Sequence, residues 1–534
     1  MNTDPKYKSA FKSLPWLAEA VWRVRHPDYE AYPGYELDSL VKALPNWVAA
    51  VQDSRVHAVQ EPKRVAIFAV LRWWVAHSAA LGMLLAGLGH DVSIFSAAYR
   101  DWRNPDSRYN LRQRREYLRS VMALGSPVVK FTDLSLARKS TLAPALEAEL
   151  FKQSLQDVQY SFQREDIDLE GNPEHAQLMS LRLERNTNLA SALIKNLKSR
   201  DYDVLIVPNG SILEFGAAYH AARYLGIPVV TYEFGEQRER VWLAQDDEVM
   251  RHDTSALWSI HGDQPLGHPE IEKLEQLFAA RRGAKTWLNF ARQWQAVPSS
   301  GTEDLRQKLN LDLNKPLALL CTNVVGDSLA LGRQVFSEGM ADWLKRTAQF
   351  FAARPDAQLV VRVHPGELLG AGQPSVEVIE SVIPKLPEHV LVIPPEAEVN
   401  TYDLIKLADL GLVYTTTVGL EMALSGLPVI VAGQTHYRDR GFTFDPDNWE
   451  EYFAELSRLL DPDEGHRLSA DQTAAAWRYA YLFFFEFPRP FPWHLVNFWS
   501  DMDERPMDEV LQPENLIQYR TTLDAMVGED FKWV

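Results

Sequence analysis

The sequence predicts an α/β protein with two Rossmann-like domains that face each other across a cleft. Strand-like apolar runs alternate with helix-like segments from Arg64 onward and again from Leu317 onward, a pattern typical of parallel sheets covered by helices. A stretch near 285–305 lacks clean periodicity and ends in Pro, Ser and Gly, as a linker does. The length of 534 residues also exceeds what one hydrophobic core usually supports.

The first half of the chain opens with a helical, aromatic segment over residues 1–60. Residues 61–290 are expected to form the first domain, because strand, helix and strand follow one another from Arg64 and again from Val204. Between these two units, residues 134–200 are rich in Leu and charged side chains, which predicts a helical insertion.

The second domain is expected over residues 305–470. It contains five short apolar runs, each followed by a loop and a helix-like segment: LALLCT, LVVRVH, VLVIP, LGLVY and LPVIVAG. Residues 471–534 then form an aromatic helical tail, which we expect to pack across both domains. The run RYAYLFFFEFP leaves contact with a membrane surface as an alternative for this tail.

Composition excludes several classes of protein. A formal net charge of −17 argues against nucleic acid as a partner. The single cysteine, Cys321, excludes a disulfide framework and favours a reducing compartment. No secretion signal is expected at the amino terminus. The apolar stretch 65–89 is broken by Arg72 and His77, so a strand and a buried helix explain it better than a membrane span.

Three consecutive threonines, Thr415 to Thr417, lie between a predicted strand and a short predicted helix. Ligands of doubly wound sheets bind where strands lead into helices, and helix amino termini attract phosphate. We expect one threonine to cap the helix and the others to hold a phosphate; capping and strand propensity alone are the alternative. Gly419 would permit close approach, and Glu421 could accept the hydroxyls of a ribose or simply favour the helix dipole.

The segment LVVRVHPGE places Arg362 and His364 on one side of a strand end that faces the same cleft. A histidine at this position can donate to a phosphate oxygen or stabilise charge on a departing phosphate. The alternative is a histidine that only ties its own loop to the backbone.

Other polar side chains follow neighbouring strands and would line the same cleft. Carboxylates at the strand ends of the first domain could serve as general base for an acceptor hydroxyl. The candidates for donor binding are Asn323, Asp327, Ser328, Gln434, His436 and Tyr437, and those for the base are Glu214 and Glu233.

Motifs of several other enzyme classes are missing from the sequence. It contains no P-loop, no G-x-S-x-G, no H-E-x-x-H and no G-x-G-x-x-G. ATP hydrolysis, ester hydrolysis, zinc peptidase action and dinucleotide redox chemistry therefore lose support.

Taken together, TNVVGDS, LVVRVHPGE, ADLGLVYTTTVGLEMALSGLPVIVAGQTHYRDRGFTFDP and RYAYLFFFEFP resemble the bacterial capsular and surface polysaccharide biosynthesis proteins, glycosyltransferases of the GT-B fold. The resemblance covers residues 317–490; in the first domain only the strand–helix pattern and TYEFGE support it. More distantly, His364-Pro365 and the threonine run are similar to motifs of bacterial sialyltransferases and Kdo transferases, which hold the phosphate of a CMP-sugar.

The resemblance implies that His364 and Thr415 to Thr417 contact the donor phosphate and that Glu421 holds the nucleotide ribose. It also makes the first domain the acceptor domain. The acidic base motif of the sialyltransferases has no clear counterpart here, so the base and the choice between inversion and retention stay open.

The expected function is transfer of a sugar from a nucleotide-sugar, with a CMP-sugar as one option, to a glycan or lipid-linked glycan of the cell surface. No cofactor and no metal is expected, since the nucleotide-sugar is a co-substrate. A cytoplasmic location is expected, with the inner face of the membrane as an alternative. A non-hydrolysing nucleotide-sugar epimerase and a non-catalytic partner in a polysaccharide assembly complex are the other functions left open.

Overall fold

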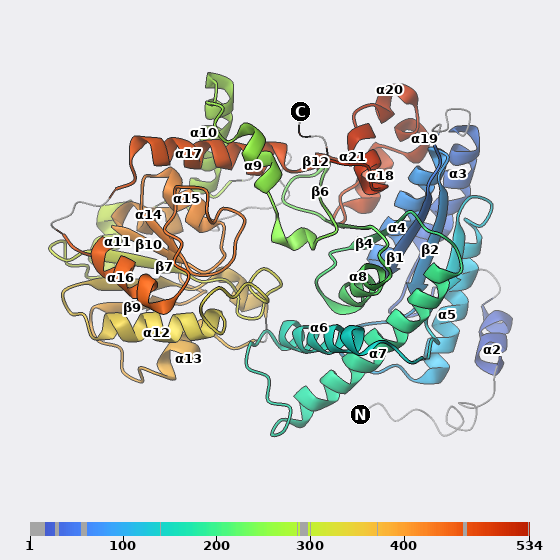
Figure 1. Cartoon of the computed structure of the whole chain (residues 1–534), viewed down its shortest axis with the longest axis horizontal. Helices are drawn as coiled ribbons and strands as arrows, with labels where there is room; N and C mark the ends of the chain where they lie inside the picture. The colour runs from blue at the N-terminus through green and yellow to red at the C-terminus, as the bar shows by residue number, and fades with distance from the viewer. Residues whose placement is uncertain are drawn as a thin grey trace.

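The computed structural model consists of two α/β bodies, each built around its own sheet (Figure 1). The structure describes residues 16–26, 31–54, 61–138, 140–285, 287–288, 297–299, 301–370, 372–462, 467–531 and 533. The predicted α/β class with two sheets is confirmed, although only the second sheet is parallel throughout. The linker expected near 285–305 falls largely outside the described residues, as does part of the helical segment expected over 1–60.

The first sheet has seven strands in the order β12-β6-β5-β4-β1-β2-β3. Neighbours from β3 to β5 run parallel, whereas β6 pairs antiparallel with β5 and β12 antiparallel with β6. Central β1 is buried over six of its seven residues, as a continuous apolar run in a covered parallel sheet should be. The strands are β1 (Arg64–Val70), β2 (Asp91–Ala97), β3 (Lys130–Asp133), β4 (Val204–Pro208), β5 (Val229–Glu233), β6 (Arg240–Gln245) and β12 (Arg489–Pro490).

Helix α4 follows β1 directly, so the apolar stretch 65–89 is a buried strand and a buried helix, as predicted. No helix among the described residues is long and apolar enough to cross a membrane. The insertion is a pair of helices, α6 and α7, that packs beside α8 (Figure 1). The helices of this half are α2 (Leu17–Arg25), α3 (Asp38–Ser54), α4 (Arg72–Gly87), α5 (Arg108–Ala123), α6 (Pro144–Phe162), α7 (Pro173–Lys198) and α8 (Leu213–Leu225).

The second sheet has five strands, all parallel, in the order β11-β10-β7-β8-β9. All five strands predicted for this domain are confirmed: β7 (Leu317–Cys321), β8 (Gln358–Arg362), β9 (Val390–Ile393), β10 (Leu410–Val413) and β11 (Val429–Val431). Its helices and 3₁₀ turn are α11 (Thr302–Lys308), α12 (Met340–Ala352), η3 (Pro365–Leu369), α13 (Ser375–Glu380), α14 (Thr401–Leu407), α15 (Val418–Leu424) and α16 (Trp449–Leu459).

Two helices assigned to the first domain by the sequence pack instead with the second sheet. After the 3₁₀ turn η2 (Val249–Arg251), helices α9 (Ser255–His261) and α10 (His268–Arg282) share their apolar core with β7, β10 and α15. Leu274 and Leu277 are fully buried in that core, and the ring of Phe278 packs edge-on against Phe484. The chain thus leaves the first body after β6, well before residue 290.

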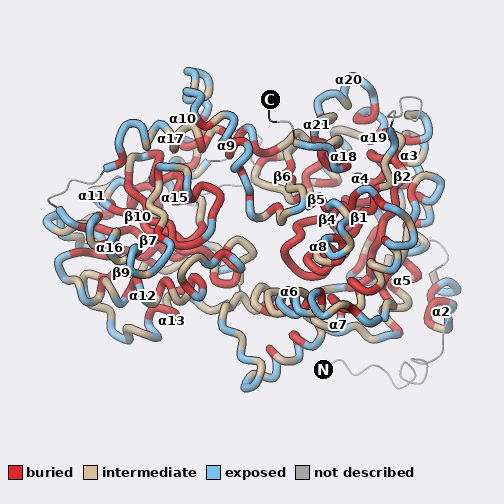
Figure 2. Tube along the Cα trace, in the orientation of Figure 1, coloured by how far each residue is buried: buried red, intermediate tan, exposed pale blue. Residues whose placement is uncertain are grey.

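The carboxyl-terminal tail contacts both bodies. It begins with α17 (Ala470–Tyr481) and a π-helical turn η4 (Leu482–Glu486) on the second body. It then adds β12 to the first sheet and continues with α18 (Phe498–Glu504), α19 (Met507–Val510), α20 (Pro513–Leu516) and α21 (Arg520–Met526). The phenylalanines of FFFEF are buried, so they offer no surface to a membrane. Figure 2 shows that buried trace lies in the interior of both bodies and exposed trace on their outer helices and loops.

The tip of the α6–α7 hairpin also joins the two bodies. The Glu165 carboxylate accepts hydrogen bonds from the N–H groups of Met340 (2.9 Å) and Ala341 (2.8 Å) at the start of α12. Gly326 is close to the same tip, since a Cβ added there would lie 2.5 Å from the backbone nitrogen of Arg164. The hairpin therefore packs against the loop that carries Asp327.

Candidate functional site

A cavity of about 190 Å³ lies at the carboxyl ends of β7, β8, β10 and β11. Its lining combines these strand ends with Met250 and Arg251 of η2 and with His252, which follows that turn. The predicted residues that the structure brings together here are Asn323, Asp327, Arg362, His364, Thr415, Thr416, Thr417, Glu421, Gln434 and His436.

The threonine run presents two free hydroxyls to this cavity. Thr415 Oγ1 donates to the carbonyl of Leu329 (2.9 Å) and so is structural. The hydroxyls of Thr416 and Thr417 make no hydrogen bond with any residue that the structure describes. The expectation that one threonine caps the helix is wrong: Thr417 occupies the cap position but has helical backbone angles and makes no side-chain cap.

His364 stands at the end of β8, where its backbone N–H donates to Thr322 Oγ1 (2.9 Å). Its Nδ1 accepts from the N–H of Gly366 (2.9 Å), so the neutral ring carries its proton on Nε2. Loss of hydration and the nearby Arg362 guanidinium lower the pKa of His364 below its ordinary value. A neutral Nε2–H donor at the edge of the cavity is the result.

Arg362 lines the cavity but is engaged by the backbone. Its guanidinium donates to the carbonyls of Pro394 (2.8 Å) and Ala397 (3.4 Å), in the loop after β9. It therefore contributes positive charge from a fixed position.

Glu421 also lines the cavity, yet its carboxylate is already engaged. Oε1 pairs with Arg281 of α10 (2.5 Å), and Oε2 accepts a hydrogen bond from the Tyr402 hydroxyl. The other arm of Arg281 pairs with Glu236 (2.8 Å), in the loop between β5 and β6. A ribose bound to Glu421 would have to share it with these partners, and this role stays a prediction.

Three predicted donor-binding residues do not line the cavity: Gly419, Ser328 and Tyr437. A Cβ at position 419 would lie 2.4 Å from the Tyr437 hydroxyl, so glycine makes room for that buried ring and not for a ligand. Tyr437 in turn donates to the Thr416 carbonyl (2.6 Å) and fixes the backbone of the threonine run. Ser328 donates its backbone N–H to Asp327 Oδ1 (2.7 Å), and burial raises the pKa of that carboxyl.

Gln434 and His436 both follow β11 but have different surroundings. Gln434 lines the cavity, and its backbone N–H donates to the carbonyl of Arg333 (2.8 Å). His436 is buried against Phe483, and its Nδ1 lies 2.9 Å from the Tyr479 hydroxyl. Burial lowers the pKa of His436 well below its ordinary value, so it is neutral.

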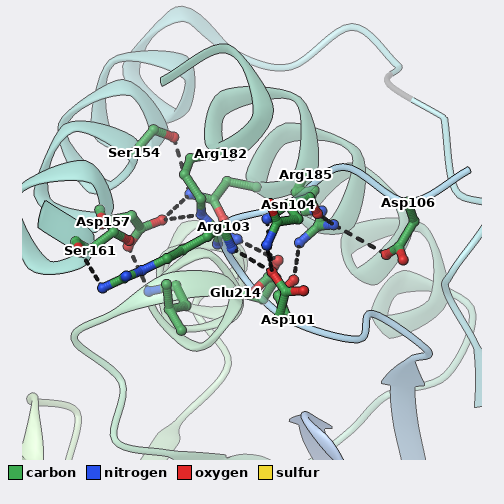
Figure 3. Close-up of polar contacts among 12 residues, drawn as sticks. Asp101, Arg103, Asn104, Asp106, Ser154, Asp157, Ser161, Arg182, Arg185 and Glu214 are labelled. Carbon is green, nitrogen blue, oxygen red and sulfur yellow. Dashed lines mark hydrogen bonds and ion pairs between the residues drawn. The ribbon is translucent and has the colours of Figure 1, made fainter. Parts of the chain in front are cut away.

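Glu214 is not available as a base. It is 2% exposed and pairs with Arg182 (2.8 Å) inside the first body (Figure 3). Burial acts to raise its pKa, but the guanidiniums of Arg182 and Arg185 outweigh it and hold the pKa below its ordinary value. The predicted role fails because the carboxylate is closed to an acceptor.

Glu233 does not line the cavity either, although it lies on the same side of the molecule. Its carboxylate accepts from Asn209 Nδ2 (3.0 Å) and from the N–H of Phe234 (3.0 Å). Burial raises the pKa of Tyr160, and the charges of Asp327 and Glu233 raise it further, so both carboxylates lie within electrostatic range of that hydroxyl. Its role as base stays a prediction.

Sequence reasoning missed several cavity residues. Arg251 and His252 follow the antiparallel strand β6, which no pattern in the sequence predicted, and Tyr402 begins α14 as a seemingly ordinary core residue. Arg333 lies in a loop of 18 residues between β7 and α12 and is only 4% exposed. A lone arginine after Gly332 carried no signal that it would be buried.

One family of known proteins matches the second half of the chain. Residues 290–458 match the family model described as "Capsule polysaccharide biosynthesis protein". No protein in a search of curated sequences matches the chain.

Several solved structures resemble this chain with low TM-scores. The KpsC beta Kdo 2,4 transferase of Thermosulfurimonas dismutans has a TM-score of 0.34 and 16% identity, covering 61% of this chain and 88% of its own. The UDP-GlcNAc 2-epimerase of Neisseria meningitidis has a TM-score of 0.25 and 14% identity, covering 79% and 100%. Scores of this size carry no conclusion about substrate.

The family match spans β7 to β11 and contains His364, the threonine run and Glu421. It ends before the aromatic run of the tail, which the resemblance had included. Over residues 290–458, the predicted similarity to capsule polysaccharide biosynthesis proteins is thus confirmed.

Proposed function

We propose that this protein is a glycosyltransferase that moves a sugar from a nucleotide-sugar to a capsular or other surface polysaccharide. The observation that carries the proposal is a set of unused donors in one cavity: the hydroxyls of Thr416 and Thr417 and the Nε2–H of His364. A phosphate group has the acceptor oxygens that match them. The family match over the same residues supports polysaccharide synthesis as the setting.

In this proposal the donor phosphate lies against the threonine run and His364. As the bond between sugar and phosphate breaks, negative charge builds up on the leaving phosphate, and fixed hydrogen-bond donors stabilise it. We propose that these side chains, with the positive charge of Arg362, do this without a metal ion. A CMP-sugar is the donor we favour, because it presents one phosphate to one cluster of donors.

The acceptor would enter from the side of the first body. Glu233 is the carboxylate that we propose as general base, since it and the cavity residue Asp327 both act on the same tyrosine, Tyr160. A glycan or lipid-linked glycan offers the hydroxyl that such a base needs.

The test is a product assay with CMP-, UDP- and GDP-sugars, each with and without a capsular oligosaccharide, followed by proton NMR. We expect release of one nucleotide and a new glycosidic signal only when oligosaccharide is present, and loss of both in His364→Ala. His268→Ala, at an exposed histidine that starts α10, is the matched control. An epimerised nucleotide-sugar formed without oligosaccharide would replace the proposal by epimerase activity, and no turnover of any donor would leave a non-catalytic partner.

A further inference from the structure

Arg333 differs from the other buried arginines of this protein. Six buried arginines bond to carboxylates or backbone carbonyls: Arg114, Arg182, Arg185, Arg281, Arg362 and Arg438. Arg333 is 4% exposed, yet its guanidinium makes no hydrogen bond or ion pair within the described part of the chain. A buried cation without a counter-charge is unfavourable, so its position calls for an anion from elsewhere.

The charges around Arg333 do not supply that anion. The two carboxylates whose charges act on Arg333, Asp247 and Glu248, pair with Arg251 at 3.2 and 3.8 Å. His252, which also lines the cavity, is neutral because burial lowers its pKa to about 3. Its Nε2 has no hydrogen-bond partner in the described part of the chain. The guanidinium of Arg333 therefore has unused capacity to bind an acceptor group from a ligand.

The backbone holds Arg333 in register with the threonine run. Thr415 Oγ1 donates to the carbonyl of Leu329, and the N–H of Gln434 donates to the carbonyl of Arg333 (2.8 Å). The loop from 329 to 333 is thus tied to the residues that follow β10 and β11. Because Thr416 and Thr417 come directly after Thr415, the cation and the free hydroxyls are parts of one fixed framework.

We infer that Arg333 is the residue that binds the phosphate of the donor and supplies the counter-charge to it. The inference rests on the proposed function for the identity of the donor, but the anion site itself does not. A guanidinium can donate to two phosphate oxygens from two nitrogens in a fixed planar geometry, which an ammonium group lacks. Arg333 would fix the orientation of the phosphate, while Thr416 and Thr417 complete its hydrogen bonds.

The first experiment measures binding by calorimetry with CMP and with cytidine, which lacks the phosphate. We expect Arg333→Met to weaken the binding of CMP at least tenfold and to leave the binding of cytidine unchanged. The CMP affinity of Arg333→Lys should lie between those of Arg333→Met and wild type. Arg119→Met, at an exposed arginine of α5, should bind CMP as wild type does. CMP binding by Arg333→Met equal to that of wild type would overturn the inference while the proposed function stands.

The second experiment does not depend on the nucleotide. Inorganic phosphate should raise the thermal midpoint of wild type and of Arg333→Lys, but not that of Arg333→Met. Without ligand, Arg333→Met should unfold at or above the wild-type midpoint, because an unpaired buried cation has been removed. A lower midpoint would show that Arg333 is structural and would overturn the inference. If CMP fails to bind wild type but phosphate still stabilises it through Arg333, the donor assignment fails and the anion site stands.

Discussion

The buried charges of the first body and those of the cavity in the second body are arranged in opposite ways. In the first body, Arg182 donates to Asp157 (3.1 Å) and Glu214 (2.8 Å) (Figure 3). It also donates to Asn186 (3.1 Å), and both Asp157 and Asn186 have further hydrogen bonds. In the cavity, Arg333 and the hydroxyls of Thr416 and Thr417 have no such partners among the residues that the structure describes.

The difference separates stability from binding. The buried ion pairs and hydrogen bonds of this network hold helices α6, α7 and α8 relative to one another, and its charges are paired within the protein. A wall with unused donors contributes little to folding and is complete only when a ligand supplies the acceptors. Burial and charge alone do not distinguish the two, since Glu214 and Glu421 are both buried beside arginines.

The largest effect is expected in the first body. Arg182→Met leaves Asp157 and Glu214 buried without their counter-charge, so the free energy of unfolding should fall by about 3 to 5 kcal/mol. Urea denaturation followed by circular dichroism measures this, with exposed Arg119→Met as the matched control. A loss below about 1 kcal/mol would remove the distinction between the two regions.

In the cavity, His364→Ala should act on binding and not on folding. Loss of one hydrogen bond to a charged phosphate should weaken nucleotide binding by about 1.5 to 3 kcal/mol. The unfolding midpoint in urea should stay close to that of His268→Ala, because the ring bonds only to its own loop. If His364→Ala unfolds early and binds nucleotide normally, the histidine is structural.

Acid should destabilise both regions through buried neutral histidines. The pKa of His77 in the first body and that of His252 in the cavity are each about 3, lowered by burial. Because an unfolded histidine titrates near 6.5, their contribution is complete above that pH and is lost as pH falls toward 3. At pH 5 each histidine should lower the free energy of unfolding by about 2 kcal/mol relative to its value at neutral pH.

His77→Phe and His252→Phe should each flatten the fall in stability between pH 6.5 and 5, as measured by urea denaturation at several pH values. Bound nucleotide should change the part of the pH dependence of stability that comes from His252, and not the part that comes from His77, since His77 lies outside the cavity. A pH dependence unchanged in both variants would contradict their assignment as neutral buried groups.

The smallest effect is expected from Tyr437→Phe. Removing the hydroxyl that donates to the Thr416 carbonyl should cost about 0.5 to 1.5 kcal/mol of stability and a similar amount of nucleotide affinity. Tyr452→Phe, which removes a buried hydroxyl bonded to Trp343 and Thr347, is a control that should lower stability alone. Unchanged nucleotide affinity in Tyr437→Phe would mean that the threonine backbone needs no such support.

The strands of the second sheet could be predicted from sequence because each is a short apolar run that ends in polar loop residues. The same logic located His364 and the threonine run, since strand ends of a parallel sheet share one edge. Side-chain partners could not be predicted, because they come from distant segments. Arg182 takes Glu214 out of use from 32 positions away, and Tyr437 accounts for Gly419.

The predicted end of the first domain at residue 290 is wrong for a related reason. Helices α9 and α10 follow the first sheet in sequence, yet their apolar faces match α17 and η4, which lie some 200 residues later. Arg333 was missed because nothing local distinguishes a buried loop arginine from an exposed one.

The most direct test of the central claim is a calorimetric titration of CMP, CDP, UDP and GDP into wild type and into Thr416→Ala/Thr417→Val. The account predicts that one nucleotide binds wild type and that the double variant loses at least about 1.5 kcal/mol of that affinity while its unfolding midpoint is unchanged. Equal affinity in the two proteins, or no binding to wild type, would contradict the claim that the free hydroxyls of this cavity hold a donor phosphate.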